Sequence, residues 1–224
     1  MLEQRSGSKT EVLPSQIALR LYSSLLLSDE EAADLILQEA HSTFDLTTIF
    51  MDVIAPCLIN LGEAWHRGEI LMSKEHYATN YLRGRLTTLM QSYPMRRNAP
   101  RVVVACAANE RHDVGSLMLS VLLRRDGYKV DFLGADVPTE DLIRYAEIEK
   151  PAMVCVSAST METAEPLKRI ASALAALQPP SSLGFGGRVF STHPLLRHSI
   201  DGEFLGESIS DACAAVRNKL GGVN

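Results

Sequence analysis

The chain has 224 residues, of which 46% are hydrophobic, and its formal net charge is −5. This length allows one large domain or two modest ones, with enough apolar residues for a packed core. The acidic balance argues against a large nucleic-acid surface, because duplex binding depends on Lys and Arg neutralising phosphates. The sequence shows no run of about eighteen apolar residues and no apolar N-terminal signal, so we expect a cytoplasmic protein outside the membrane.

The apolar pattern from Pro14 to about Asn98 is helical, and residues 1–13 form an expected disordered tail. We predict four helices: 16–27 capped by Ser15, 30–41 capped by Asp29, a long third helix opened by Asp45 or Thr47 and ended by Gly68, and 74–93 capped by Ser73. Pro56 should kink the third helix or divide it in two. Short links between the helices predict a four-helix bundle cap over residues 14–98.

A polar, proline-bearing stretch at 94–100 marks the predicted domain boundary, and the pattern then changes to alternating strands and helices. The predicted strands are 102–107, 129–133, 153–157 and 182–185, and the predicted helices are 114–125, 139–149, 164–177 and 208–220, with a short region near 193–198. Such alternation predicts a doubly wound, Rossmann-like parallel sheet with helices on both faces, over residues 99–224.

The four cysteines are far apart, and each lies in an apolar segment; they are Cys57, Cys106, Cys155 and Cys213. This spacing predicts small buried core residues, and it does not suggest disulfides or zinc ligands.

Three polar motifs follow three predicted strands. The first is Glu110-x-His112-x-x-Gly115, the second is Ser157-x-Ser159, and the third is Gly186-Gly187. A lone loop histidine is usually only a solvated residue. These motifs, however, fall at the carboxyl ends of strands, where α/β sheets bind their ligands.

In order and spacing, the three motifs resemble the cobalamin-binding domain of the base-off, histidine-on type, over about half of the chain. The resemblance implies that His112 is the lower axial cobalt ligand and that Glu110, where the family more often has Asp, accepts the proton of the other ring nitrogen. It also implies a slot for the displaced nucleotide base, and the residues involved besides His112 and Glu110 are Asp113, Val114, Gly115, Ser157, Ser159, Gly186 and Gly187.

The predicted bundle contains Trp65-His66 and, after a glycine, Glu75-His76. Separately these would be a core Trp and solvated polar residues. Together they resemble the helical cap of the CarH type of cobalamin-dependent light-sensing regulator. The resemblance implies that Trp65 shields the 5′-deoxyadenosyl group of adenosylcobalamin, that Glu75 and His76 hydrogen-bond this group, and that His66 ligates cobalt after photolysis.

The CarH type carries a helix-turn-helix module ahead of its bundle, and only residues 1–13 precede the bundle here, so we expect no direct DNA binding. The resemblance implies a sensory module that is not an enzyme, with a light-dependent homo-oligomer and a downstream signalling protein as partners. Related photocobilins also hold biliverdin, so biliverdin is a candidate second cofactor here too, but no cysteine or histidine in the sequence stands out as a biliverdin site. The alternatives are a corrinoid methyl-carrier protein of a methyltransferase system and a cobalamin storage or chaperone protein.

Overall fold

The computed structural model describes residues 12–223, and the described chain forms two compact units. The first unit ends at Asn80 and is helical; the second begins at Tyr81 and contains a five-stranded parallel sheet. This confirms the expected fold class of a helical bundle followed by a doubly wound sheet. Most of the expected disordered tail, residues 1–11, lies outside the described residues.

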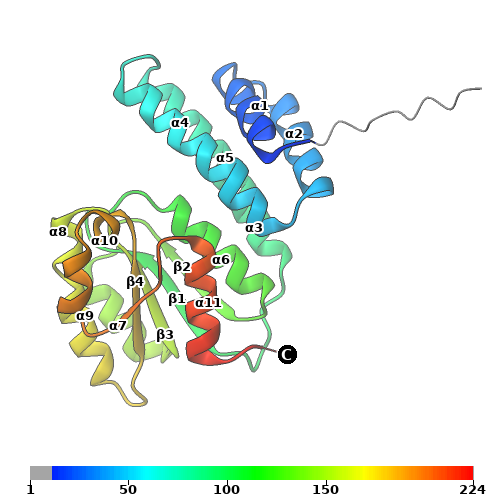
Figure 1. Ribbon diagram of the computed structural model, residues 1–224. Helices are drawn as coiled ribbons and strands as arrows, with labels where there is room; N and C mark the ends of the chain where they lie inside the picture. The colour runs from blue at the N-terminus through cyan, green and yellow to red at the C-terminus, as the bar shows by residue number, and fades with distance from the viewer. Residues whose placement is uncertain (1–11, 224) are drawn as a thin grey trace, which may run out of the picture. The chain divides into compact units, whose positions relative to one another are not determined.

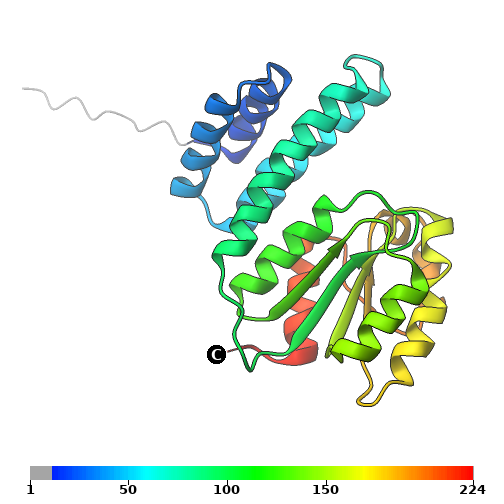
Figure 2. The same ribbon diagram turned by 180° about the vertical axis from the view of Figure 1, so that it is seen from behind.

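The helices of the first unit follow one another with short turns (Figures 1 and 2). They are α1 (Pro14–Leu26), α2 (Glu30–Thr43), α3 (Leu46–Thr48), the π-helix η1 (Ile49–Ile54), α4 (Ala55–His66) and the first part of α5 (Met72–Ser92). One face of α1 supplies Ile17, Leu21 and Leu25 to the core, where Phe50 and Leu61 are also buried. These buried positions recur at a spacing of about 3.6 residues, as in an amphipathic helix.

Two of the predicted helix caps are confirmed. Asp29 accepts a hydrogen bond from the Ala32 amide at 3.0 Å, and Asp45 accepts from the amides of Thr47 and Thr48 at 2.9 and 3.1 Å. The predicted Ser15 and Ser73 caps are wrong, because α1 already begins at Pro14 and α5 at Met72. Proline is favoured at a first helical position because it lacks an N–H that would need a partner there.

The third predicted helix is divided near Pro56, as expected. The π-helix η1 precedes the proline, and the Ala55 amide donates to the carbonyl of Phe50, five residues earlier. Proline removes one intrahelical N–H and collides with the carbonyl four residues before it. A wider π turn at this point accommodates both effects without ending the helix.

One stretch, Leu46–His66, is long and apolar enough to cross a membrane by length and composition alone. It is not an uninterrupted apolar run, because it contains Asp52 and Glu63. Its side chains Ile49, Phe50, Val53 and Leu61 are fully buried within the first unit. Since 33% of the apolar window is buried, packing of the bundle accounts for part of this composition.

The second unit is built on five parallel strands in the order β2-β1-β3-β4-β5. The strands are β1 (Arg101–Cys106), β2 (Lys129–Gly134), β3 (Met153–Ser157), β4 (Ser182–Gly186) and β5 (Glu203–Phe204). The helices are α6 (Val114–Arg125), α7 (Thr139–Glu149), α8 (Met161–Ala164), α9 (Leu167–Ala175), α10 (Arg188–Thr192), the 3-10 helix η2 (Pro194–Ser199) and α11 (Ile209–Leu220).

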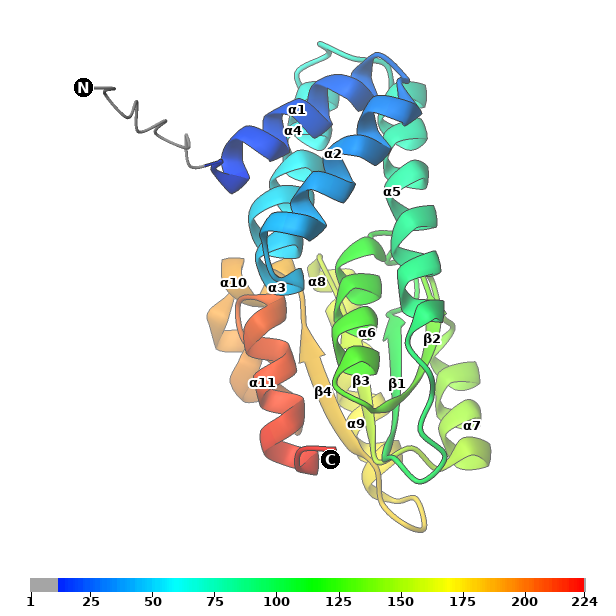
Figure 3. The same cartoon turned by 90° about the vertical axis from the view of Figure 1, so that its right-hand side faces the viewer.

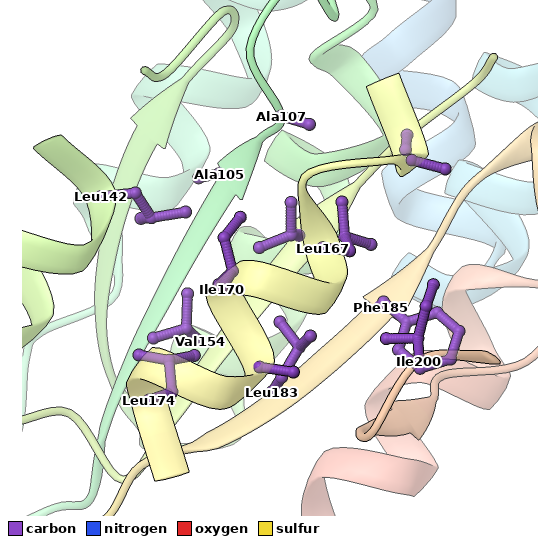
Figure 4. Close-up of a cluster of buried hydrophobic side chains, with 14 of the residues drawn as sticks. Ala105, Ala107, Leu142, Val154, Leu167, Ile170, Leu174, Leu183, Phe185 and Ile200 are labelled. Carbon is purple, nitrogen blue, oxygen red and sulfur yellow. The ribbon is translucent and has the colours of Figure 1, made fainter. Parts of the chain in front are cut away.

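The strand sequence alternates between the two faces of the sheet. Val103, Ala105 and Val154 pack with Leu142 of α7 and Ile170 of α9 in a buried cluster (Figure 4). The helices α6 and α11 cover the opposite face (Figure 3). Both faces are therefore buried, which is why these strands read as continuous apolar runs. All four cysteines are free and buried, as predicted.

Three details of this unit were not predicted. The helix expected at 164–177 is the shorter α9, which begins after Pro166, and the short helix α8 that precedes this proline was not predicted. The helix α10 and the two-residue strand β5 were missed, since both are too short to show a period.

Candidate functional site

The last residues of three neighbouring strands lie in one row. Cys106 of β1 is in register with Ser157 of β3, and Ser157 with Gly186 of β4. Because β1 lies between β2 and β3, the chain reverses its direction of winding at β1 and β3. Such a switch point is where α/β sheets bind ligands. The structure thus brings the three sequence motifs together at one edge.

His112 is held by a buried carboxylate. Its Nδ1 lies 2.7 Å from Oε1 of Glu110, and its backbone amide donates to the same oxygen at 2.9 Å. The His112 side chain is 86% exposed, whereas that of Glu110 is 2% exposed. An ionised carboxylate only accepts hydrogen bonds, so Nδ1 donates the proton of this contact and Nε2 is the ring nitrogen left for another partner.

The surroundings of Glu110 favour its ionised form, which accepts the hydrogen bond from His112. Burial tends to raise the pKa of Glu110, but hydrogen bonds from the His112 amide, the Ser159 hydroxyl and the His112 ring outweigh burial and lower it. Glu110 is therefore ionised at neutral pH. Its second oxygen, Oε2, is buried and forms no hydrogen bond of ordinary geometry with the described residues.

A second loop supports the His112 loop from the side of β2. The carboxylate of Asp136 accepts a hydrogen bond from the amide of Asn109 at 2.6 Å, and the Asp136 amide donates to the carbonyl of Glu110 at 2.8 Å. Asn109 has a positive φ of 66° and Asp136 one of 51°. Asn and Asp tolerate this left-handed conformation better than most residues, which allows the tight turn here.

Arg83 is a site neighbour that the sequence did not reveal. Its Nη2 lies 2.8 Å and its Nε 3.2 Å from Oδ1 of Asp113, the residue after His112. Arg83 lies in the part of α5 that belongs to the second unit. No local pattern could have identified it, because the two partners are far apart in sequence and Arg83 reads as an ordinary helix-surface residue.

A pocket of about 180 Å³ opens between α6 and α11 on the sheet. The residues that line it are mostly small or apolar, and they include Val104, Gly115, Ser116, Leu119, Cys155, Ser157, Gly186, Gly187, Ser208 and Ala212. A Cβ atom placed on Gly115 would meet nothing within 4 Å, so there is free space beside the first turn of α6, next to the pocket. A flat, mainly apolar ring system is the kind of group that fits such a slot.

Gly187 is required by the backbone. Its φ is +111°, and a Cβ there would lie 2.2 Å from the carbonyl oxygen of Ala158. The loops after β3 and β4 therefore approach each other more closely than any side chain at this position would allow.

The remaining predicted residues lie in the first unit. Trp65 and His66 are exposed at the end of α4, and the first turn of α5 carries Glu75 and His76. Glu75 accepts a hydrogen bond from the Thr79 hydroxyl at 2.7 Å, and its other oxygen lies 3.6 Å from Nε2 of His76. Trp65 is 43% exposed, so it is not the core residue that a Trp at a helix end usually is.

Comparisons with known proteins identify the family and the fold. A family model described as a B12 binding domain matches residues 100–214, and a second B12 binding domain model matches residues 17–90. The monomethylamine corrinoid protein of Methanosarcina barkeri has a similar fold, with a TM-score of 0.73 and 16% identity over 92% of this chain and 99% of that chain.

The HTH-type transcriptional repressor CarH of Myxococcus xanthus is 32% identical over 137 residues, which cover 61% of this chain and 46% of CarH. The repressor CarA of the same organism is 26% identical over 138 residues. The chain thus spans about half the length of these curated relatives. The methanol–corrinoid protein of Methanosarcina barkeri is 36% identical over 69 residues, 31% of this chain and 27% of that protein.

Proposed function

Because the chain belongs to the B12 binding domain family, we propose that this corrinoid-binding protein holds adenosylcobalamin and acts as a light sensor. The observation that carries the site is the exposed imidazole of His112, held at Nδ1 by buried Glu110. The residues present fit a cobalt corrinoid: His112 would offer a nitrogen donor to the metal, and the pocket would give room for the nucleotide base.

On the lower side, Glu110 keeps the proton on Nδ1 of His112 and so leaves Nε2 as the donor to cobalt. A carboxylate behind a ligating histidine fixes the ring orientation and raises its basicity. The pocket between α6 and α11 would hold the nucleotide base of the cofactor, with Gly115 at its entrance and Ser157 offering a hydroxyl. Gly187 allows the backbone to approach that base closely.

Four residues of the first unit would hold the adenosyl group or the metal. Bound adenosylcobalamin supplies a cobalt–carbon bond that light cleaves. Trp65 offers a broad apolar surface that shields the adenosyl group, and Glu75 and His76 hydrogen-bond it. His66 would offer its ring nitrogen as a ligand to the metal. This assignment is supported by the Trp65-His66 and Glu75-His76 arrangement and by the identity with CarH.

The proposed signal is a light-dependent change in how strongly the protein associates with a partner. Light produces a signal only when the dark and illuminated arrangements differ in affinity for a second copy of the chain or for a downstream signalling protein. The differential free energy between the two arrangements sets the limit of that response.

A corrinoid methyl carrier is the second candidate, and the similarity to the methanol–corrinoid protein favours it. In a carrier, two partner proteins must reach the cobalt, so an indole above it would hinder transfer. Trp65 and the longer match to CarH therefore favour the sensor. The third candidate is a cobalamin storage or chaperone protein, for which cobalamin binding alone would be enough.

Spectra and size-exclusion chromatography of the loaded protein, in the dark and after complete photolysis, test the proposal. We expect wild type to change its mass or partner affinity and to gain a second imidazole ligand, and His66→Ala to lose that stable product. His41→Ala, an exposed histidine of the same unit, is the matched control and should behave as wild type. Identical mass, partner binding and cobalt ligation before and after photolysis would support a carrier or storage role. A red absorption band would reveal bound biliverdin.

A further inference from the structure

Asp113 stands at the N-cap of α6, but its side chain makes no capping hydrogen bond. An Asp at this position ordinarily accepts from the amides of the first helical turn. Here Oδ1 of Asp113 instead accepts from Nη2 and Nε of Arg83, at 2.8 and 3.2 Å. The Asp113 carboxylate therefore does not cap α6 and instead forms an ion pair with Arg83 of α5.

The pair is placed where it can control the His112 loop. The side chain of Asp113 is 10% exposed and that of Arg83 is 36% exposed, so water screens the ion pair only in part. Asp136 holds the start of the loop through Asn109, and Arg83 holds its end through Asp113. His112 lies between these two attachments. Charge-assisted hydrogen bonds of this kind are stronger and more directional than neutral ones.

We propose that Arg83 is a positioning residue for the lower ligand: by holding Asp113, it fixes the direction in which His112 presents Nε2 to a corrinoid. The inference rests on the proposed ligation by His112, and Arg83 itself does not touch the cofactor. It adds a member to the site from α5, a helix outside the three sequence motifs.

The experiment compares Arg83→Gln and Arg83→Lys with Arg85→Gln, an exposed arginine of the same helix. Each full-length variant is titrated with cobalamin for Kd, and its cob(II)alamin complex is examined by electron paramagnetic resonance for nitrogen coupling from an axial imidazole. We expect Arg83→Gln to raise Kd about tenfold and to lower the imidazole-ligated fraction. Arg83→Lys should recover part of both, and Arg85→Gln should match wild type.

A double variant, Arg83→Gln with Asp113→Asn, separates positioning from the cost of an unpaired buried charge. It removes both charges, so a stable protein is expected in which imidazole ligation is still reduced. Wild-type Kd and ligation in the double variant, or in Arg83→Gln alone, would overturn the inference. His112→Ala is the reference: if it keeps wild-type ligation, the proposed ligand itself is wrong, which distinguishes that failure from the failure of Arg83.

Discussion

Glu110 shows how one side chain sets the chemistry of the residue beside it. Replacement by Gln keeps its size but removes the anion that accepts the Nδ1 proton of His112. Changes of this sort cost about 10-fold to 100-fold in metal affinity. We therefore expect Glu110→Gln to weaken cobalamin binding by that factor, measured by equilibrium titration. Unchanged affinity would show that His112 does not depend on Glu110.

The same carboxylate predicts a pH dependence of the protein without cofactor. The pKa of Glu110 in the folded state lies below its ordinary value of 4.5. Its charge therefore stabilises the fold above about pH 4.5, and this contribution is lost as the pH falls through the lower folded-state pKa. Denaturant unfolding between pH 6 and pH 3 should show a smaller loss of stability in Glu110→Gln than in wild type.

Two glycines should respond to alanine with opposite signs. At Gly187 a Cβ would collide with the Ala158 carbonyl and the φ is +111°, so we expect a loss of about 1–3 kcal/mol in the free energy of unfolding. At Gly84, inside α5, a Cβ meets nothing within 4 Å, and alanine should stabilise the helix by about 0.5–1 kcal/mol. Chemical denaturation measures both; equal effects would contradict the backbone argument.

Residue patterns located the pair of Glu110 and His112 but not the residues that hold their loop, and ligation of cobalt by His112 stays a prediction. Glu110 and His112 could be found because they are two positions apart and follow an apolar strand. Arg83 could not be found, because its partner Asp113 is distant in sequence and nothing in α5 marks one arginine above another. Whether Trp65, His66, Glu75 and His76 act on a bound corrinoid stays a prediction.

At the scale of elements, the side chain of Asp45 caps the N-terminus of the third helical stretch. Asp45 accepts from two amides and from the Thr48 hydroxyl at 2.9 Å. We expect Asp45→Ala to lower the free energy of unfolding by about 1 kcal/mol, and Asp45→Asn, which can still cap, to lose less. Thermal unfolding of the three proteins checks this order. If Asp45→Asn destabilises the protein as much as Asp45→Ala does, the negative charge of Asp45 stabilises the helix rather than its capping hydrogen bonds.

The long strands and helices were predictable because each carries a clear hydrophobic period, and α6, α7 and β3 have the predicted bounds. The errors share a physical cause. Ser15 and Ser73 resemble caps, but tertiary packing extends both helices past them. The strand β5 has two residues, and only its pairing with β4 makes it a strand. Such features depend on partners that local sequence does not show.

At the scale of the whole molecule, the four thiols report on folding. Burial raises the pKa of Cys57, Cys155 and Cys213 to about 12 and that of Cys106 to about 11. In the native state they are protonated and covered, so we expect negligible reaction with a disulfide reagent at pH 8, and reaction of all four in guanidinium. Rapid labelling of one thiol in native protein would indicate local opening around it.

The π-helix Ile49–Ile54 lets the chain carry one extra residue without turning the helix end that bears Trp65. A π turn contains about one residue more than an α turn, which is equivalent to a single-codon insertion. Each residue rotates an α-helix by about 100°, so an extra residue in a regular helix would move Trp65 and His66 to another side of it. The wider turn absorbs that residue instead. An aligned relative that lacks the extra residue would therefore present the same two side chains in nearly the same direction.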